Sequence, residues 1–182
     1  PDNSYPAKMY DFVNERHNDG IAWEDTRDMV YDRYQVNQMD GYDITSRNLH
    51  CNGCFAAGIN FAASIISLLY GEGDIKKTIK IGSLCGWDSD NPTATWGGLI
   101  GFMIGKKGIE TAFGRTFSDK YNIHRTRIGF PNNGIDTFTN MAEGGILVAD
   151  KMIQEQVGGR IDYDRDCWYI PSKSVDVSNT FQ

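Results

Sequence analysis

Residues 86 to 105 read Gly-Trp-Asp-Ser-Asp-Asn-Pro-Thr-Ala-Thr-Trp-Gly-Gly-Leu-Ile-Gly-Phe-Met-Ile-Gly, and the interpretation of the chain starts from this stretch. Asp88 and Asp90 are two residues apart, so their carboxylates point to the same side if the backbone there is extended. Converging carboxylate oxygens suit Mg²⁺ or Ca²⁺, whereas zinc prefers nitrogen and sulfur ligands. Asn91 and Pro92 predict a helix N-cap followed by proline at the first helical position, which would fix the geometry of this turn.

Glycine recurs every fourth residue after the acidic turn, at Gly97, Gly101 and Gly105. Residues four apart lie on one face of a helix, so these glycines form a bare stripe that another backbone can approach closely. The acidic turn is therefore expected at the start of a helix packed inside a larger helical body.

The motif Cys85-Gly86-Trp87-Asp88, continued by Ser89-Asp90 and the glycine-rich helix, resembles the C-terminal metal motif of the ADP-ribosylglycohydrolases. These are relatives of dinitrogenase reductase-activating glycohydrolase, and one branch of the family has Cys-Gly-Trp-Asp at this place. The resemblance is clear over residues 51–105 and weaker as far as residue 159. It implies an all-α fold, a compact multi-helix orthogonal bundle, in which residues 1–182 form a single domain that is the C-terminal portion of the family's domain.

The resemblance also implies a site for two Mg²⁺ ions, with Asp88 and Asp90 in the positions of the family's metal-binding aspartates. Asn91 stands where the family has threonine, and its side chain either contacts the metal or caps the helix. His50, Asn52 and Trp87 are the candidate substrate-binding residues, and their alternatives are a surface or packed histidine, a helix cap and a core aromatic side chain. No catalytic acid is assigned, because in the family it belongs to an upstream portion.

The family's first metal motif, a Thr-Asp-Asp cluster, has no convincing equivalent here. The segment 23–28 reads Trp-Glu-Asp-Thr-Arg-Asp, but its charges are spaced for pairing along a helix, which favours a solvated surface helix. We therefore expect the N-terminal portion of the same protein, absent or on a separate chain, to be a partner that shares one or both metal ions.

Three functions compete at this level. The first is a Mg²⁺-dependent hydrolase that cleaves the glycosidic bond of ADP-ribose attached to a protein or small-molecule acceptor. The second is a catalytically inactive structural or ADP-ribose-binding relative of the same fold. The third, a nucleoside hydrolase, is disfavoured because its acidic motif follows a β-strand near the start of the chain, whereas Asp88 lies mid-chain after an expected helix.

Composition is that of an ordinary globular protein: 182 residues are 40% hydrophobic and 23% charged, which is enough to build a core. The net charge of -6 argues against a nucleic-acid-binding surface, which would need a basic stripe. Four cysteines are present, and the pair Cys51-x-x-Cys54 lacks a second pair to complete a zinc site. Buried thiols are the favoured interpretation of that pair, and a disulfide is the alternative if the protein is secreted; we favour a soluble, cytoplasmic protein.

Capping residues, glycines and apolar spacing divide the chain into expected elements. The apolar segment 52–70 is nearly long enough to span a bilayer, but its Ala, Gly, Ser and Asn content favours a central helix buried by other helices, and no membrane association is expected. Asp74 and Asp136 are expected N-caps, and residues 167–171 are expected to be β-prone. Helices are predicted over residues 6–16, 23–34, 52–70, 74–84, 91–105 and 136–157.

Overall fold

The computed structural model describes residues 3–43, 53–123 and 128–172. They form two compact units, Pro1–Phe117 and Ser118–Gln182. The last helix of the first unit ends where Gly114 adopts a left-handed conformation (φ 63°), and the polar segment after it begins the second unit.

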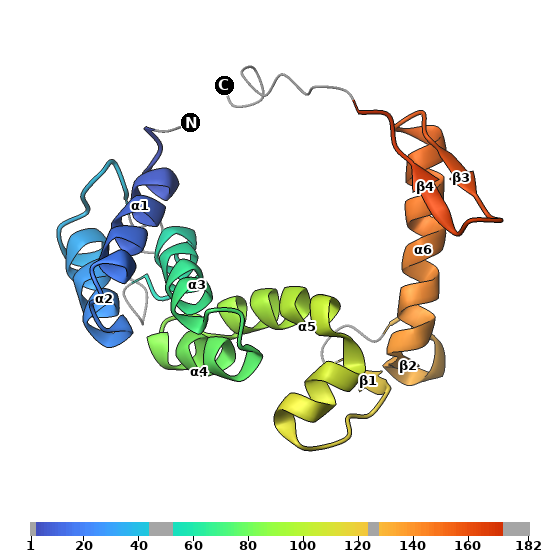
Figure 1. Ribbon diagram of the computed structural model, residues 1–182, viewed down its shortest axis with the longest axis horizontal. Helices are drawn as coiled ribbons and strands as arrows, with labels where there is room; N and C mark the ends of the chain where they lie inside the picture. The colour runs from blue at the N-terminus through green and yellow to red at the C-terminus, as the bar shows by residue number, and fades with distance from the viewer. Residues whose placement is uncertain (1–2, 44–52, 124–127, 173–182) are drawn as a thin grey trace. The chain divides into compact units, whose positions relative to one another are not determined.

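Helices make up the first unit (Figure 1). They are α1 (Tyr5–Asn18), α2 (Trp23–Val30) with a π-helical turn (Tyr31–Val36) after it, α3 (Ala57–Gly71), α4 (Ile75–Cys85) and α5 (Asp90–Phe113). The helical predictions for this part of the chain are confirmed, although the central helix begins at Ala57 rather than at residue 52.

Local signals explain several helix ends. The Ser4 side chain accepts a hydrogen bond from the Ala7 N–H at the start of α1. The predicted cap at Asp74 is confirmed, because its carboxylate accepts from the Lys77 N–H at 2.7 Å. Within α5 the helix is broken at Gly105, whose φ of 66° and ψ of 172° no helix can contain.

The core of this unit surrounds α3, which packs against α1, α2, α4 and α5. Its side chains are buried on most sides, as the all-round apolar sequence of this segment predicted. Fully buried Met9, Val13, Val30 and Tyr34 reach it from α1, α2 and the π-helical turn. Among the described residues, none of the helices is both long and apolar enough to cross a membrane.

Two glycines of α3 let neighbouring groups approach the helix closely. A Cβ on Gly58 would enter the ring of Tyr42, and a Cβ on Gly71 would lie 2.9 Å from the Thr78 Cα in α4. The crossing of α3 and α4 therefore depends on the absence of a side chain at Gly71.

The second unit has one helix and two short hairpins among its described residues. Strands β1 (Lys120–Asn122) and β2 (Ile135–Thr137) pair antiparallel and lead into α6 (Phe138–Glu155). Strands β3 (Arg160–Asp162) and β4 (Cys167–Tyr169) form the second hairpin, which confirms that the tail is β-prone. The sequence did not predict the first hairpin, and the α6 cap is Thr137, whose hydroxyl accepts from the Asn140 N–H, rather than Asp136. The described chain is mostly helical.

Candidate functional site

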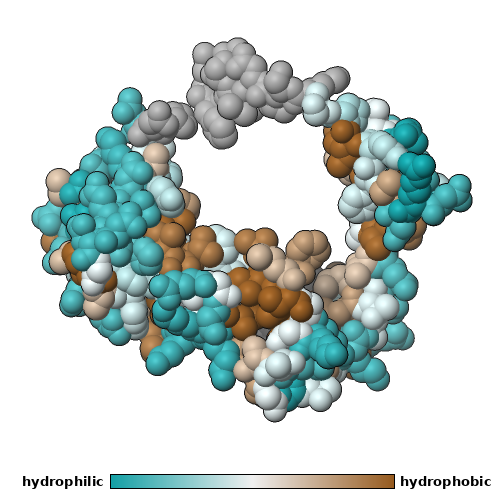
Figure 2. Space-filling view, viewed as in Figure 1, coloured by the Kyte–Doolittle hydropathy of each residue, from teal (hydrophilic) through white to brown (hydrophobic). Residues whose placement is uncertain are grey.

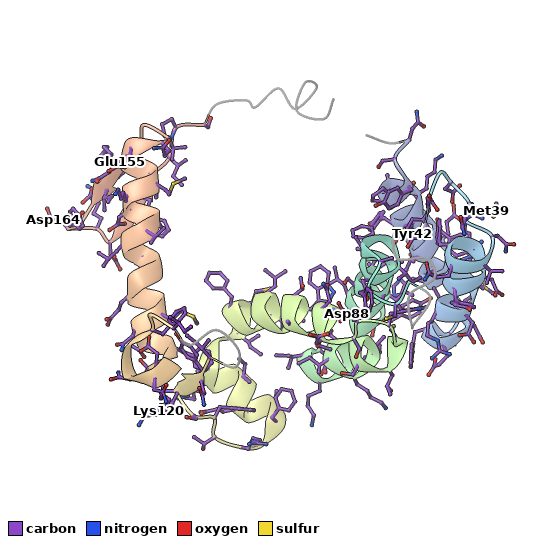
Figure 3. The ribbon with its side chains drawn as sticks, turned by 180° about the vertical axis from the view of Figure 1, so that it is seen from behind. Met39, Tyr42, Asp88, Lys120, Glu155 and Asp164 are labelled. Carbon is purple, nitrogen blue, oxygen red and sulfur yellow. The ribbon has the colours of Figure 1, made fainter. Side chains whose placement is uncertain are left out.

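The acidic turn, residues 86–90, connects α4 to α5 and reverses the chain through two left-handed residues. Gly86 has φ 91° and Trp87 has φ 57°, a conformation that is uncommon for a residue with a side chain. The Asp88 carbonyl then accepts a hydrogen bond from the Asn91 N–H at 2.9 Å, which closes the turn onto the first residues of α5. Asp88 lies where this turn meets α3 (Figure 3).

The carboxyl groups of Asp88 and Asp90 lie within hydrogen-bonding reach of each other, although Ser89 between them is helical (φ -65°, ψ -16°) rather than extended as the expectation assumed. A hydrogen bond between the two side chains raises the pKa of Asp88 above its ordinary value, and some desolvation and the negative charge of Asp90 act in the same direction. Asp88 is half-buried and Asp90 is exposed. Two carboxylates within hydrogen-bonding reach of each other repel when both are ionised. A bound divalent cation would relieve that repulsion.

Asn91 does not cap α5, so this part of the prediction is wrong. The helix begins one residue earlier, at Asp90, and Ser89 occupies the N-cap position without a side-chain hydrogen bond to the helix. Pro92 is consequently the third helical residue rather than the first, and it is buried. The reason is the left-handed pair before Asp88, which turns the chain into the helix sooner than the Asn-Pro signal indicates. The Asn91 side chain is left exposed.

Two hydrogen bonds to acceptors on α3 hold the acidic turn and the start of α5. The Asp88 N–H donates to the Asn60 side-chain oxygen at 3.1 Å, and the Trp96 indole N–H donates to the Ser64 carbonyl at 2.7 Å. Asn60 and Trp96 were not among the predicted site residues. The sequence did contain a signal for Asn60. It is a polar residue in a largely apolar segment, and a buried amide needs hydrogen-bond partners.

Trp87, a predicted substrate-binding residue, is part of the packing of the first unit. Its ring stacks on Tyr31 with 6.5 Å between centroids and an angle of 21° between the planes, and it packs against the core around α3. This is the core alternative stated above for Trp87. His50 and Asn52, the other two predicted substrate-binding residues, lie outside the described residues.

The acidic residues of α2 are on the surface, as their spacing indicated. Glu24, Asp25 and Asp28 are exposed, and Asp28 pairs with Arg27 at 2.7 Å. Within residues 3–43, 53–123 and 128–172, no three His, Cys, Asp or Glu side chains are grouped so as to hold a metal ion. In these ranges Asp88 and Asp90 are therefore a pair of neighbouring carboxyl groups without a third such side chain grouped with them.

The cysteines divide into two kinds. Cys54 is disulfide-bonded, so the interpretation of this residue as a buried thiol is wrong. Cys85 and Cys167 are free thiols, and burial raises the pKa of Cys85 to about 12. Cys85 is thus a core side chain immediately before the acidic turn, and its high pKa argues against a role as a nucleophile.

Comparison of the chain with protein-family models, with curated proteins and with solved structures finds no match.

Proposed function

We propose that the acidic turn is half of a Mg²⁺ site in a hydrolase that cleaves the glycosidic bond of ADP-ribose linked to a protein or small-molecule acceptor. The single observation that carries the proposal is the pairing of the Asp88 and Asp90 carboxyl groups in a turn that α3 and α5 hold in place. The motif around these residues, which resembles that of the ADP-ribosylglycohydrolases, supports the substrate class and an orthogonal helical bundle.

The donor set fits Mg²⁺. Carboxylate oxygens are hard ligands, and Mg²⁺ completes an octahedral shell with water and substrate oxygens around one or two protein carboxylates. The exposed side-chain carbonyl of Asn91 is the candidate for a third protein ligand, because it is not engaged as a helix cap. Further ligands and the proton donor are assigned by the resemblance to an N-terminal portion of the same protein.

The chain's own residues contribute position and charge to the reaction. Asp88 and Asp90 would hold the cation at the ribose, and a bound Mg²⁺ supplies orientation of the sugar hydroxyls and polarisation of a water molecule. Cleavage at an anomeric carbon passes through a transition state with oxocarbenium character, which nearby carboxylates stabilise.

Release of free ADP-ribose tests this proposal. The wild-type protein, with its N-terminal portion present, is incubated with ADP-ribosylated arginine and ADP-ribosylated serine, and the product is separated by chromatography. We expect release that requires Mg²⁺ and is lost in Asp88→Asn and Asp90→Asn but retained in Asp25→Asn, a matched change at an exposed aspartate of α2. Equal turnover in a chelator, or unchanged turnover in Asp88→Asn, would contradict the proposal.

A further inference from the structure

Asn60 is an amide side chain inside the most buried helix of the protein. Only 5% of the residue is exposed, and its helical neighbours on α3 include the fully buried Ile59 and Ala63. Asparagine is a poor helix former, and burial of its amide is unfavourable unless the polar atoms find partners. A leucine would pack here without either disadvantage, so the amide must be explained by what it binds.

Each polar atom of the Asn60 side chain has a backbone partner. Its oxygen accepts from the Asp88 N–H at 3.1 Å, and its nitrogen donates to the carbonyls of Cys54 at 2.7 Å and Ala56 at 3.1 Å. This orientation of the amide matches its surroundings, because the Asp88 N–H donates to the oxygen while the carbonyls of Cys54 and Ala56 accept from the nitrogen. Both N–H donors of the amide are used, and its oxygen is the one that faces the acidic turn.

The acidic turn needs such a partner. Trp87, the residue before Asp88, is held at φ 57°, and a left-handed conformation of a non-glycine residue has an energetic cost that the surroundings must offset. The repulsion between ionised Asp88 and Asp90 also favours their separation. Asn60 fixes the N–H of Asp88 while the Asn91 N–H fixes its carbonyl, so the backbone of Asp88 is held at both ends.

We propose that Asn60 is the positioning residue that keeps the carboxyl group of Asp88 beside that of Asp90. It acts through the backbone of Asp88 and touches neither carboxyl group. The consequence for metal binding rests on the proposed function, whereas the hydrogen bond to Asp88 and its effect on the turn do not. Residues that orient metal ligands typically change metal affinity by about 10- to 100-fold when they are replaced.

Three variants separate positioning from general destabilisation. Asn60→Leu keeps the branching of the side chain at Cγ, is larger, and removes every hydrogen bond of the amide, whereas Asn60→Asp keeps the size and an oxygen that can accept from the Asp88 N–H. Ser64→Ala is the matched control, since Ser64 lies one helical turn further along α3, is 8% exposed, and its hydroxyl donates to the Asn60 backbone carbonyl rather than to the turn.

The first readout is hydrogen exchange of the Asp88 amide by NMR in protein without metal. We expect slow exchange in the wild type and in Ser64→Ala, exchange about tenfold faster in Asn60→Leu, and intermediate exchange in Asn60→Asp, because the lost hydrogen bond no longer opposes local opening of the turn. The Asp88 amide exchanging equally fast in the wild type and in Asn60→Leu would overturn the inference, whatever the outcome for metal.

The second readout is Mg²⁺ affinity by calorimetry. Asn60→Leu is expected to bind Mg²⁺ about tenfold more weakly or worse, while Ser64→Ala binds like the wild type. An equal loss of Mg²⁺ affinity in Asn60→Leu and Ser64→Ala would mean that the affinity falls because the protein is destabilised. That result would overturn the positioning role of Asn60. If the wild type binds no Mg²⁺, the proposed function fails, and the exchange of the Asp88 amide alone decides the role of Asn60.

Discussion

Gly71 and Gly98 are both helical glycines, and we predict that replacing them with alanine has opposite effects on stability. Alanine is favoured over glycine in a helix by about 1 kcal/mol. At Gly71 the new Cβ would lie 2.8 Å from the Thr78 Cβ and 2.9 Å from its Cα, so the α4 backbone must move. Overpacking of this kind costs about 1–3 kcal/mol, and contact with backbone places it near the upper end. Gly71→Ala should therefore destabilise the protein by about 2 kcal/mol net.

Gly98→Ala is the matched control. Gly98 is exposed on α5 with no atom within 4 Å of the added Cβ, so only the helix preference remains and the protein should gain about 0.5–1 kcal/mol. The assay is urea unfolding followed by far-ultraviolet circular dichroism, with the free energy of unfolding obtained by linear extrapolation. A stabilised Gly71→Ala would refute the close approach of α3 and α4 at this contact.

Three further outcomes are expected. Because the folded-state pKa of Asp88 is raised, stability falls as pH rises from the ordinary aspartate pKa through the raised one. Asp90→Asn should flatten this fall in thermal melts, and an unchanged slope would exclude an interaction between the two carboxyl groups. Thr78→Val should raise the free energy of unfolding by about 1 kcal/mol in urea titrations, because the buried Thr78 hydroxyl has no hydrogen-bond partner. A lower free energy of unfolding would show that this hydroxyl does have a hydrogen-bond partner. Burial raises the pKa of Cys85 to about 12, so iodoacetamide at pH 8 should label Cys167 in the folded protein and Cys85 only after unfolding. Mass spectrometry measures the labelling, and rapid labelling of native Cys85 would contradict its burial.

The helices were predictable because their signals are local. Asp74 caps α4, glycines follow α1 and α3, and the segment that became α3 is apolar on all sides. The proximity of Asp88 and Asp90 was expected from an extended turn, whereas the structure brings the two carboxyl groups together with Ser89 in a helical conformation. These features need no knowledge of what lies elsewhere in the chain.

The errors concern features that depend on distant or unusual backbone. The left-handed conformation of Trp87 starts α5 before Asn91, and nothing in the local sequence requires a tryptophan to adopt it. Asn60 is 28 residues from Asp88, so their hydrogen bond follows only from the crossing of three helices. The β1–β2 hairpin pairs short segments separated by residues 123–134, without a two-residue turn signal to indicate it.

An exposed apolar surface lies on α5 beyond the acidic turn. Leu99, Phe102 and Met103 are 49%, 88% and 76% exposed, and Figure 2 shows hydrophobic surface over this helix. The glycine stripe expected to face packed backbone is only partly covered: a Cβ on Gly97 would meet Ile79, and one on Gly101 would meet Ile109. Within the described residues, the atoms that approach Gly97 and Gly101 belong to side chains rather than to another backbone, and no atom lies within 4 Å of a Cβ on Gly105.

Direct Mg²⁺ binding at the acidic turn tests the account most directly. Calorimetric titration of Mg²⁺ into the full-length protein, repeated with Asp88→Asn, Asp90→Asn and the control Asp25→Asn, measures it without reference to any substrate. The account predicts saturable binding in the wild type and Asp25→Asn that disappears in both acidic-turn variants. Binding that survives in Asp88→Asn and Asp90→Asn, or no binding by the folded wild-type protein, would contradict it.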